Sequence, residues 1–432
     1  MTGLSARRLA TAVAVSSASA LAFMLPGAAS ASAAQIKGQG STLQEYAQQK
    51  VFKPAFETLK EGEITEYKGT GSGAGLEAWG NSGHAAEYNT WEYVGTDQPP
   101  NPTQKKAIEE KAGGAAVLSI PTLQAAVAII VHLPTGCTSI SSKAKKETTH
   151  LALNDKTVEE IFAHKITKWN QIKDTSDKLN PAGCEGETPI TRVVRSDGSG
   201  TTAILKKWFY QVNDLPVDGS ETWNELAEKN KNLPWPEETV NLVRGSGSGG
   251  IVSTVTADAG SIGYVNLANA YEGGFGSTGV MSWAVVENKA GKKPTYKSPE
   301  KPGPKKKIDK KKVVTEGESN CASTSYVNGL GEKFPPKSTE EAWNEVSAAT
   351  SEPNYPICGF TYDLSLKGFS SIEPSLRPTT EQVELVKKYF TFMVTEGPKL
   401  LVNGTDYLAL PENVSEEKNV LSIAKKGTEK IS

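Results

Sequence analysis

The turn over residues 195–202, which reads Arg-Ser-Asp-Gly-Ser-Gly-Thr-Thr, constrains the fold of this chain more than any other stretch. It lies between an apolar run typical of a strand, Pro189–Val194, and an amphipathic run typical of a helix, Ala203–Val212. The start of a helix leaves about four backbone N–H groups without partners and carries a partial positive charge. The pattern therefore predicts a strand that ends at a helix start able to hold an anion.

The side chains of this turn suit an oxyanion. Arg195 offers a planar, charged fork that matches phosphate or carboxylate. The glycines at positions 198 and 200 let the backbone approach a ligand closely. The hydroxyl groups are those of Ser199, Thr201 and Thr202. A small polar turn can also serve only to cap a helix, so this stretch by itself leaves both interpretations open.

Length and charge narrow the class of protein. At 432 residues the chain can form two or three domains, and 37% apolar residues suffice for a buried core. The formal net charge is −2, and removal of Arg7 and Arg8 makes it −4. A nucleic-acid-binding protein would carry a clustered basic face, so we expect no nucleic-acid partner.

The N-terminal sequence predicts export. Arg7 and Arg8 precede an apolar, Ala-rich run, Leu9–Leu25, and residues 31–33 read Ala-Ser-Ala, a small-residue cleavage site. We therefore assign residues 1–34 to a signal peptide. Hydroxyl side chains within the apolar run favour a cleaved peptide over a membrane-spanning helix. No cysteine follows the cleavage site as a point of lipid attachment, so we expect a soluble protein outside the cytoplasm.

The four cysteines predict two disulfide bonds. No two of them have a CxxC spacing and the four histidines are scattered, so we expect no metal site. Three pairings are possible in principle. We favour Cys137–Cys184 and Cys321–Cys358, because each pair flanks loop-like sequence within one region.

Two further glycine-rich turns, at residues 38–43 and 68–75, carry hydroxyl groups and precede helix-like sequence. Residues 93–100 predict a short strand that ends at Asp97, a carboxylate that could accept a hydrogen bond from a protonated ligand. One glycine-rich turn is commonly just a loop, but three turns of the same chemistry favour a shared binding site.

Four other stretches predict local structure. Val117–Leu133 contains apolar runs broken by a proline at position 121, which predicts buried strands where the chain crosses into another domain. Capping-box spacing predicts helix starts at Thr157–Glu160 and at Thr379–Gln382. Lys292–Lys312 is rich in lysine and proline and predicts an exposed, poorly ordered loop.

No motif predicts catalysis. The chain has no Walker A sequence, no GxSxG elbow and no HExxH zinc motif. Residues 245–250 match GxGxxG, but no βαβ unit with a well-placed acidic residue surrounds them, so we assign no dinucleotide. Ser199 as a nucleophile would need a general base that the sequence does not identify. We expect no cofactor and no enzymatic activity.

In order and spacing these stretches resemble the phosphate-binding proteins of ABC-type phosphate uptake systems. The resemblance rests on residues 38–42 (GQGST), 67–72 (YKGTGS), 95–99 (GTDQP) and 195–201 (RSDGSGT). Further family-like sequence stands at residues 165–170 (KITKWN), 260–265 (GSIGYV) and 406–411 (DYLALP). The likeness covers most of residues 37–416, and several ordered motifs together are more specific than any single glycine-rich turn.

The resemblance implies an α/β, two-lobed periplasmic-binding-protein fold of type II. Two hinge crossings would join the lobes, which close over one phosphate. Residues 35–122 and 359–432 would form lobe one, and residues 123–358 would form lobe two. An insertion with the Lys- and Pro-rich loop, at about 292–358, would lengthen lobe two, and residues 76–92 would be a second insertion.

The resemblance also implies a binding site. Eight residues would hold the phosphate: Thr42, Leu43, Ser72, Asp97, Arg195, Ser199, Gly200 and Thr201. Asp97 would accept the proton of HPO₄²⁻, and the others would donate hydroxyl, guanidinium or backbone N–H groups. Asp197 would pair with Arg195 and orient its fork. The family commonly has an aromatic residue at the position of Leu43, but we expect that contact to survive because the backbone makes it.

Asp97 gives a physical basis for selectivity. Phosphate near neutral pH carries a proton that it can donate to a carboxylate, whereas sulfate has none and would face an uncompensated negative charge. Such a contact costs on the order of a few kcal/mol, so discrimination of about a hundredfold or more is expected.

The implied function is that of an extracytoplasmic receptor, monomeric, which captures inorganic phosphate and delivers it to the membrane subunits of an ABC phosphate permease. One alternative is a receptor for another oxyanion, such as sulfate or molybdate. A second is a non-transport surface or signalling protein that keeps the fold. An enzyme acting on phosphate esters is a third.

Overall fold

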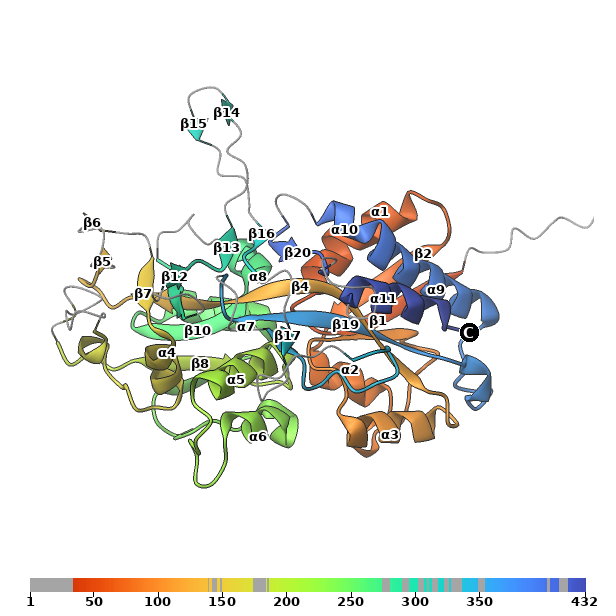
Figure 1. The fold of residues 1–432 in the computed structure, drawn as a ribbon, viewed down its shortest axis with the longest axis horizontal. Helices are drawn as coiled ribbons and strands as arrows, with labels where there is room; N and C mark the ends of the chain where they lie inside the picture. Colours follow the sequence, from red (N-terminus) through yellow and green to blue (C-terminus); the bar gives the residue numbers. More distant parts are fainter. Residues whose placement is uncertain are drawn as a thin grey trace, which may run out of the picture. The chain divides into compact units, whose positions relative to one another are not determined.

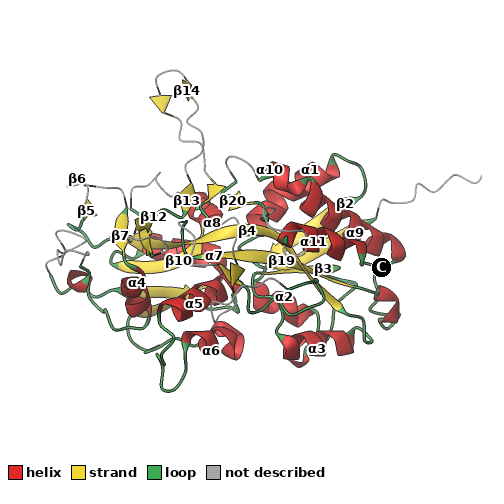
Figure 2. Cartoon of the chain, viewed as in Figure 1, coloured by secondary structure: helices red, strands yellow, loops and turns green. Residues whose placement is uncertain are grey.

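The computed structural model describes most of the chain after residue 33 (Figures 1 and 2). The described residues are 34–138, 140–141, 146–147, 150–173, 184, 186–273, 280–289, 295–301, 307–308, 311–312, 318–321, 326–327, 336–348, 354–401, 405–411 and 419–432. The predicted signal peptide, apart from Ala34, lies outside them, and so does much of the predicted Lys- and Pro-rich loop.

Eight strands form the main path of a mixed sheet, in the order β2-β1-β3-β19-β4-β10-β8-β9. Their bounds are β1 (Gln35–Gly40), β2 (Glu63–Gly69), β3 (Tyr93–Thr96), β4 (Val117–His132), β8 (Thr191–Arg195), β9 (Leu242–Gly245), β10 (Ser261–Asn266) and β19 (Cys358–Leu366). Off this path, β11 (Ser282–Asn288) pairs with β4, with β7 (Leu151–Leu153) and with β12 (Thr295–Lys297), and β20 (Tyr407–Leu408) pairs with β4.

Short strand pairs lie apart from this sheet. Among the described residues they are β5 (Ile140–Ser141) with β6 (Lys146–Glu147), β13 (Glu300–Lys301) with β16 (Glu318–Ser319), β14 (Lys307–Ile308) with β15 (Lys311–Lys312), and β17 (Tyr326–Val327) with β18 (Ser347–Ala348). All four pairs are antiparallel.

β4 passes through both halves of the main sheet. It is 16 residues long, and every residue except His132 is buried. Val117–Ala126 pairs with β19 and Val127–His132 pairs with β10, in both cases antiparallel. Where the partner changes, the Val127 N–H donates to the carbonyl oxygen of Ile357 at 2.9 Å. Two stretches of chain therefore run side by side from one half of the sheet to the other (Figure 1).

A bulge in this pairing accommodates Pro121. The register skips Thr122, because Tyr362 lies opposite Pro121 and Thr361 lies opposite Leu123. Proline has no N–H to donate, and a bulge is a place in a ladder where that loss is tolerated. The sequence predicted separate strands on either side of Pro121; this prediction is wrong, because the bulge lets one strand continue through the proline.

Parallel pairing brings the ends of several strands to one edge. β1 is parallel to β2 and to β3, and β8 is parallel to β9 and to β10. Ligand sites in α/β sheets lie beyond the carboxyl ends of such strands. Here those ends are Gly40 of β1, Thr96 of β3, Arg195 of β8 and Gly245 of β9, and each is followed by one of the glycine-rich or acidic turns that the sequence singles out.

Helices cover the strands. They are α1 (Lys53–Glu57), α2 (Ser72–Ala78), α3 (Pro102–Lys111), α4 (Asp155–Phe162), α5 (Gly200–Val212), α6 (Trp223–Glu228), α7 (Gly247–Ala257), α8 (Leu267–Glu272), α9 (Thr380–Thr395), α10 (Gly397–Leu400) and α11 (Val420–Glu429), with a π-helical segment at Ala47–Phe52. Figure 1 shows α1, α2, α3, α9 and α11 around the half that contains β1, and α4, α5, α6 and α7 around the half that contains β8. Across the described residues, none of these helices is long and apolar enough to cross a membrane.

The two predicted capping boxes have different outcomes. Thr379 caps α9, and Gln382 completes the box as predicted. The predicted box at Thr157 is wrong, because α4 begins at Asp155. The side chain of Asn154 accepts the Thr157 N–H at 2.6 Å, so an earlier residue takes the cap and adds almost a full turn to the helix.

Residues 76–92 form a packed unit beside α3. Trp79 and Tyr88 are fully buried, and their rings meet edge to face with centroids 5.3 Å apart. The Tyr88 hydroxyl lies 3.1 Å from the Ile108 carbonyl oxygen of α3, to which it donates. The segment that the resemblance marks as an insertion is thus attached to the helix next to it by both packing and a hydrogen bond.

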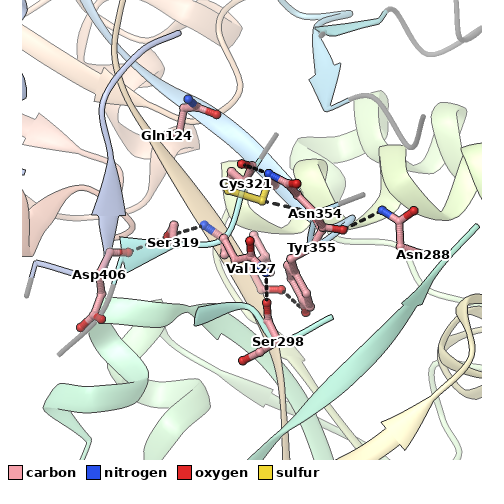
Figure 3. The surroundings of a disulfide bond; sticks show 12 residues. Gln124, Val127, Asn288, Ser298, Ser319, Cys321, Asn354, Tyr355 and Asp406 are labelled. Carbon is pink, nitrogen blue, oxygen red and sulfur yellow. Dashed lines mark hydrogen bonds between the residues drawn. A yellow bond between two sulfur atoms is a disulfide. The ribbon is translucent and has the colours of Figure 1, made fainter. Parts of the chain in front are cut away.

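The cysteines pair as the sequence favours, Cys137 with Cys184 and Cys321 with Cys358. Figure 3 shows the second bond close to the place where β4 changes partners. There the Ser319 hydroxyl accepts the Ala126 N–H at 2.9 Å and donates to the Asp406 carbonyl oxygen at 2.6 Å. The segment before Cys321 is therefore attached to β4 by a hydrogen bond as well as to β19 by the disulfide.

Replacement of both Cys321 and Cys358 by serine should lower the free energy of unfolding by about 4 kcal/mol, since the bond closes a loop across 37 residues in the unfolded chain. Urea unfolding of the oxidised wild type and of the double variant checks this. A reducing agent should lower the urea midpoint of the variant less than that of the wild type, because the variant has only the Cys137–Cys184 bond to lose. Equal stability of the two oxidised proteins would contradict the prediction.

Candidate anion-binding site

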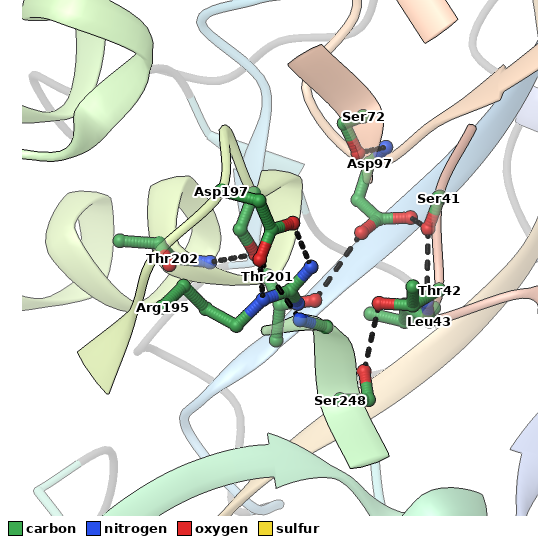
Figure 4. Close-up of polar contacts among 12 residues, drawn as sticks. Ser41, Thr42, Leu43, Ser72, Asp97, Arg195, Asp197, Thr201, Thr202 and Ser248 are labelled. Carbon is green, nitrogen blue, oxygen red and sulfur yellow. Dashed lines mark hydrogen bonds and ion pairs between the residues drawn. The ribbon is translucent and has the colours of Figure 1, made fainter. Parts of the chain in front are cut away.

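The turns at the strand ends meet around Asp97. Thr42 and Leu43 follow β1, Ser72 begins α2, and Asp97 follows β3. Arg195 ends β8, Ser199 caps α5, and Gly200 and Thr201 begin that helix. The side chains of this set are buried, and Figure 4 shows most of them directed toward one another. The structure thus brings together all eight residues that the sequence selected.

The Asp97 carboxylate accepts hydrogen bonds from hydroxyl groups on both halves of the sheet. Ser41 donates to its Oδ1, and Thr201 donates to its Oδ2 at 3.3 Å. The Asp97 N–H donates to the Ser72 hydroxyl at 3.1 Å, which fixes the backbone as well. Because Ser41 and Ser72 belong to one half of the sheet and Thr201 to the other, Asp97 joins the two halves.

Burial raises the pKa of Asp97 to about 6. The hydrogen bonds from Ser41 and Thr361, followed by the positive charge of Arg195 and the bond from Thr201, lower the pKa and so oppose part of this rise. Asp97 therefore changes its charge near pH 6, where an exposed aspartate would stay ionised.

Arg195 forms a two-point pair with Asp197. Its Nε lies 2.8 Å from Oδ1 of Asp197, and its Nη2 donates to the other carboxylate oxygen. Burial alone would raise the pKa of Asp197, but the hydrogen bond and charge of Arg195 hold that pKa below its usual value. Oδ1 also accepts the Gly247 N–H at 2.9 Å. The carboxylate thus orients the guanidinium and is itself held by the start of α7.

The start of α5 lies in close contact with the Asp97 turn. A Cβ atom at position 200 would come within 2.6 Å of the Asp97 Cβ and 2.7 Å of the Gln98 nitrogen. Such distances are far below van der Waals contact, so only glycine fits between the two turns. The side chain of Ser199 accepts the Thr202 N–H at 3.2 Å and caps the helix. The turn therefore both caps α5 and lies beside Asp97.

Polar side chains outside the centre bridge the same two halves. The Gln98 amide donates to the Ala227 carbonyl oxygen at 3.1 Å and accepts from the Asn232 amide at 2.9 Å. The Asn232 Oδ1 also accepts the Ser199 N–H at 3.3 Å. Lys231 pairs with Glu77 across the same boundary. Hydrogen bonds and an ion pair outside the centre therefore also connect the two halves around Asp97.

Sequence reasoning missed three members of this site. Ser41 donates to Asp97, Ser248 lies 2.9 Å from the Thr42 hydroxyl, and the backbone of Gly247 holds Asp197. The last two belong to residues 245–250, whose sequence matches the dinucleotide motif GxGxxG. A usable signal was present, because this stretch is also a glycine-rich turn with hydroxyl groups before helix-like sequence.

Within the described ranges, no group of three or more histidine, cysteine, aspartate and glutamate side chains is placed to hold a metal ion. The chemistry of the site is that of hydroxyl groups, backbone N–H groups, one guanidinium and two carboxylates. Such a set can bind an oxyanion by hydrogen bonding.

Asp97→Asn should remove a pH-dependent part of the stability of the ligand-free protein. The folded pKa is about 6 against a reference value of 3.8, so folding favours the protonated acid. The stabilisation that protonation gives is complete below about pH 4 and is lost as the pH rises through 6. Between pH 4 and pH 7 the wild type should lose about 2 kcal/mol relative to the variant. Urea unfolding across that range measures the difference, and parallel pH profiles would contradict the assignment.

Known proteins are similar to this chain in sequence and in fold. A family model described as a PBP superfamily domain matches residues 26–332. The phosphate-binding protein PstS of Methanocaldococcus jannaschii is 26% identical over 389 residues, which are 88% of this chain and 84% of that protein. Alkaline phosphatase L of Pseudomonas aeruginosa is 24% identical over 241 residues, which are 55% of this chain and 57% of that protein.

Among solved structures, a high affinity periplasmic phosphate-binding protein (PfluDING) bound with phosphate superimposes with a TM-score of 0.56 at 18% identity. The match covers 91% of this chain and 98% of that one. At this identity the likeness concerns the fold alone. The family match, with the mixed sheet and the turns that meet at its strand ends, shows that this chain belongs to the PBP superfamily and has the two-lobed α/β fold of periplasmic binding proteins.

Proposed function

We propose that this protein is an extracytoplasmic receptor that captures inorganic phosphate and delivers it to the membrane subunits of an ABC permease. The observation that supports the proposal most directly is the buried carboxylate of Asp97 beside Arg195 and the start of α5. The relative with the widest coverage reported above is named a phosphate-binding protein. The receptor acts as a monomer, and residues 1–34 direct its export.

Three kinds of donor hold the phosphate in this proposal. Backbone N–H groups come from the turn after β1 and from the start of α5, whose 13 residues give a full helix dipole. The Nε and Nη2 atoms of Arg195 donate to Asp197. Its Nη1 makes no hydrogen bond to the described residues, so this nitrogen donates to the phosphate. Hydroxyl groups come from Thr42, Ser72, Ser199 and Thr201.

Several of these hydroxyl groups bond to protein atoms in the structure. Thr201 donates to Asp97, the Ser72 hydroxyl accepts from the Asp97 backbone, and Thr42 lies beside Ser248. A hydroxyl group turns about one bond, so each can redirect its proton to an oxyanion with little movement of the backbone. The same rotation lets Asp97 exchange the bond from Thr201 for one from a protonated phosphate.

Asp97 selects phosphate over sulfate in this proposal. Above its pKa of about 6 the ionised carboxylate accepts the proton of HPO₄²⁻ and repels a fully ionised anion. Below that pKa the protonated acid can donate a hydrogen bond to sulfate. Discrimination therefore weakens as the acid becomes protonated, and an amide in place of the carboxylate should leave it weak at every pH.

Calorimetric titration of ligand-free protein with phosphate and with sulfate tests the function and the selectivity together. At pH 8 the wild type should bind one phosphate about a hundredfold or more tightly than sulfate. That ratio should fall as the pH is lowered through 6, and Asp97→Asn should reduce it at pH 8.

Two outcomes would count against the proposal. Absence of phosphate heat from a folded sample would exclude the receptor and leave a surface or signalling protein that keeps the fold. Tighter binding of sulfate or molybdate than of phosphate would favour a receptor for another oxyanion.

A phosphate-ester hydrolase is a second candidate, because one relative is named alkaline phosphatase L. The contacts of Ser199 give this candidate no support: its hydroxyl accepts the Thr202 N–H as a helix cap, and no histidine, aspartate or glutamate side chain is bonded to it within the described residues. Release of phosphate from a chromogenic ester by the purified protein, lost in Ser199→Ala, would revive the enzyme.

Gly200→Ala should weaken phosphate binding about tenfold or more, because a methyl group at this position would force the start of α5 away from Asp97. Gly249→Ala is the matched control, since it adds the same methyl group near the start of α7, where no atom lies within 4 Å. Calorimetry measures both. Equal affinities for the two variants would show that the close contact at Gly200 does not matter for binding.

A further inference from the structure

We infer that Ser248 is a positioning residue of the site, which holds the hydroxyl group of Thr42 so that its proton is directed at the bound anion. This inference rests on the proposed function. It assigns a role to a residue of the glycine-rich stretch 245–250, whose sequence pattern gave no function.

The two hydroxyl groups meet across the boundary between the halves of the sheet. The Ser248 Oγ lies 2.9 Å from the Thr42 Oγ1, although 206 residues separate them in the chain. Both side chains are buried, with 2% and 6% of their residue surfaces exposed. Figure 4 shows Ser248 projecting from the start of α7 toward Thr42. In the structure each of these buried hydroxyl groups therefore has the other as a hydrogen-bond partner.

Proton counting gives the contact a direction. A hydroxyl group has one proton to donate and two lone pairs that accept. When Thr42 donates its proton to an oxyanion, only its lone pairs remain for Ser248, so Ser248 must donate. The bond from Ser248 then selects the rotamer in which the Thr42 proton faces the anion, and it polarises that O–H group.

The backbone of α7 fixes Ser248 in this place. The N–H of Gly247, the preceding residue, donates to Asp197 at 2.9 Å, and Asp197 holds the guanidinium of Arg195. Gly247 has a φ of 63°, which glycine adopts without strain. The first two residues of α7 thus contact Asp197 and Thr42. The start of this helix therefore couples the position of the Arg195–Asp197 pair to that of the Thr42 hydroxyl group.

The contact also depends on the approach of the two halves. Thr42 belongs to the turn after β1 and Ser248 to the start of α7, the helix that follows β9. The strands β1 and β9 lie at opposite parts of the sheet order. A positioning role therefore predicts that Ser248 acts only through the Thr42 hydroxyl group. A residue that merely packed at the boundary would act whether or not that hydroxyl group were present.

A double-mutant cycle measured by phosphate calorimetry separates these cases. Ser248→Ala should weaken phosphate binding about 3- to 10-fold, the range expected for one buried neutral hydrogen bond. In a Thr42→Val background, which has no hydroxyl group, Ser248→Ala should have no further effect. In a Thr42→Ser background, which keeps the hydroxyl group, the loss should return.

Ser253→Ala is the control, because it removes an exposed hydroxyl group from the same helix and should leave the affinity unchanged. Circular dichroism and the melting temperature of every variant establish that it is folded. If the wild type binds phosphate and Ser248→Ala weakens binding equally in the wild-type, Thr42→Val and Thr42→Ser backgrounds, the positioning role is overturned and the proposed function stands. A folded wild type that binds no phosphate would reject the function and this inference together.

Discussion

The antiparallel pairing of β4 with β19 determines where every turn of the site can lie. β19 carries β3 and β1 on its other side, and β4 carries β10, β8 and β9 on its own. Both faces of these two strands are buried, so a shift by one residue would exchange the side chains that face each layer. The bulge at Pro121 resists such a shift, because the register between β4 and β19 skips a residue there.

The charged side chains of the site carry no net positive charge. Arg195 is matched by Asp197, and an ionised Asp97 adds one further negative charge, so the three side chains together do not attract an anion. Affinity in the proposed receptor must come from oriented N–H and O–H groups and from helix starts, whose dipoles are already aligned before the ligand arrives. This arrangement favours hydrogen-bonding geometry over net charge as the basis of recognition, which suits a receptor that must distinguish two anions of similar size.

Local patterns predicted local features of this chain well. The strand and helix on either side of the turn at 195–202, the strand that ends at Asp97 and the cap of α9 all depend on residues a few positions apart. The two disulfide pairs also followed from loops within one region. The resemblance to a family supplied the selection of the eight site residues, which no single turn could have justified.

What the sequence did not predict depends on distant residues. Ser41 and Asp97 are 56 positions apart, and Thr42 and Ser248 are 206 apart, so their contacts require the register of the whole sheet. The continuous strand through Pro121 depends on a bulge that the partner strand creates. The wrong cap at Thr157 is a local error, because Asn154 offered a second side chain able to cap the same helix.

The pairing of β13 with β16 has a consequence for engineering. Glu300 lies opposite Ser319, and Lys301 lies opposite Glu318, so the two ends of the segment between Lys301 and Glu318 lie side by side. The disulfide of Cys321 attaches the chain after this segment to β19. The entropy of closing a loop rises slowly with its length, by about 0.6 kcal/mol for each doubling. A reporter peptide or a second protein grafted between Lys301 and Glu318 should therefore disturb the sheet very little, which makes this position a natural attachment point for building a biosensor.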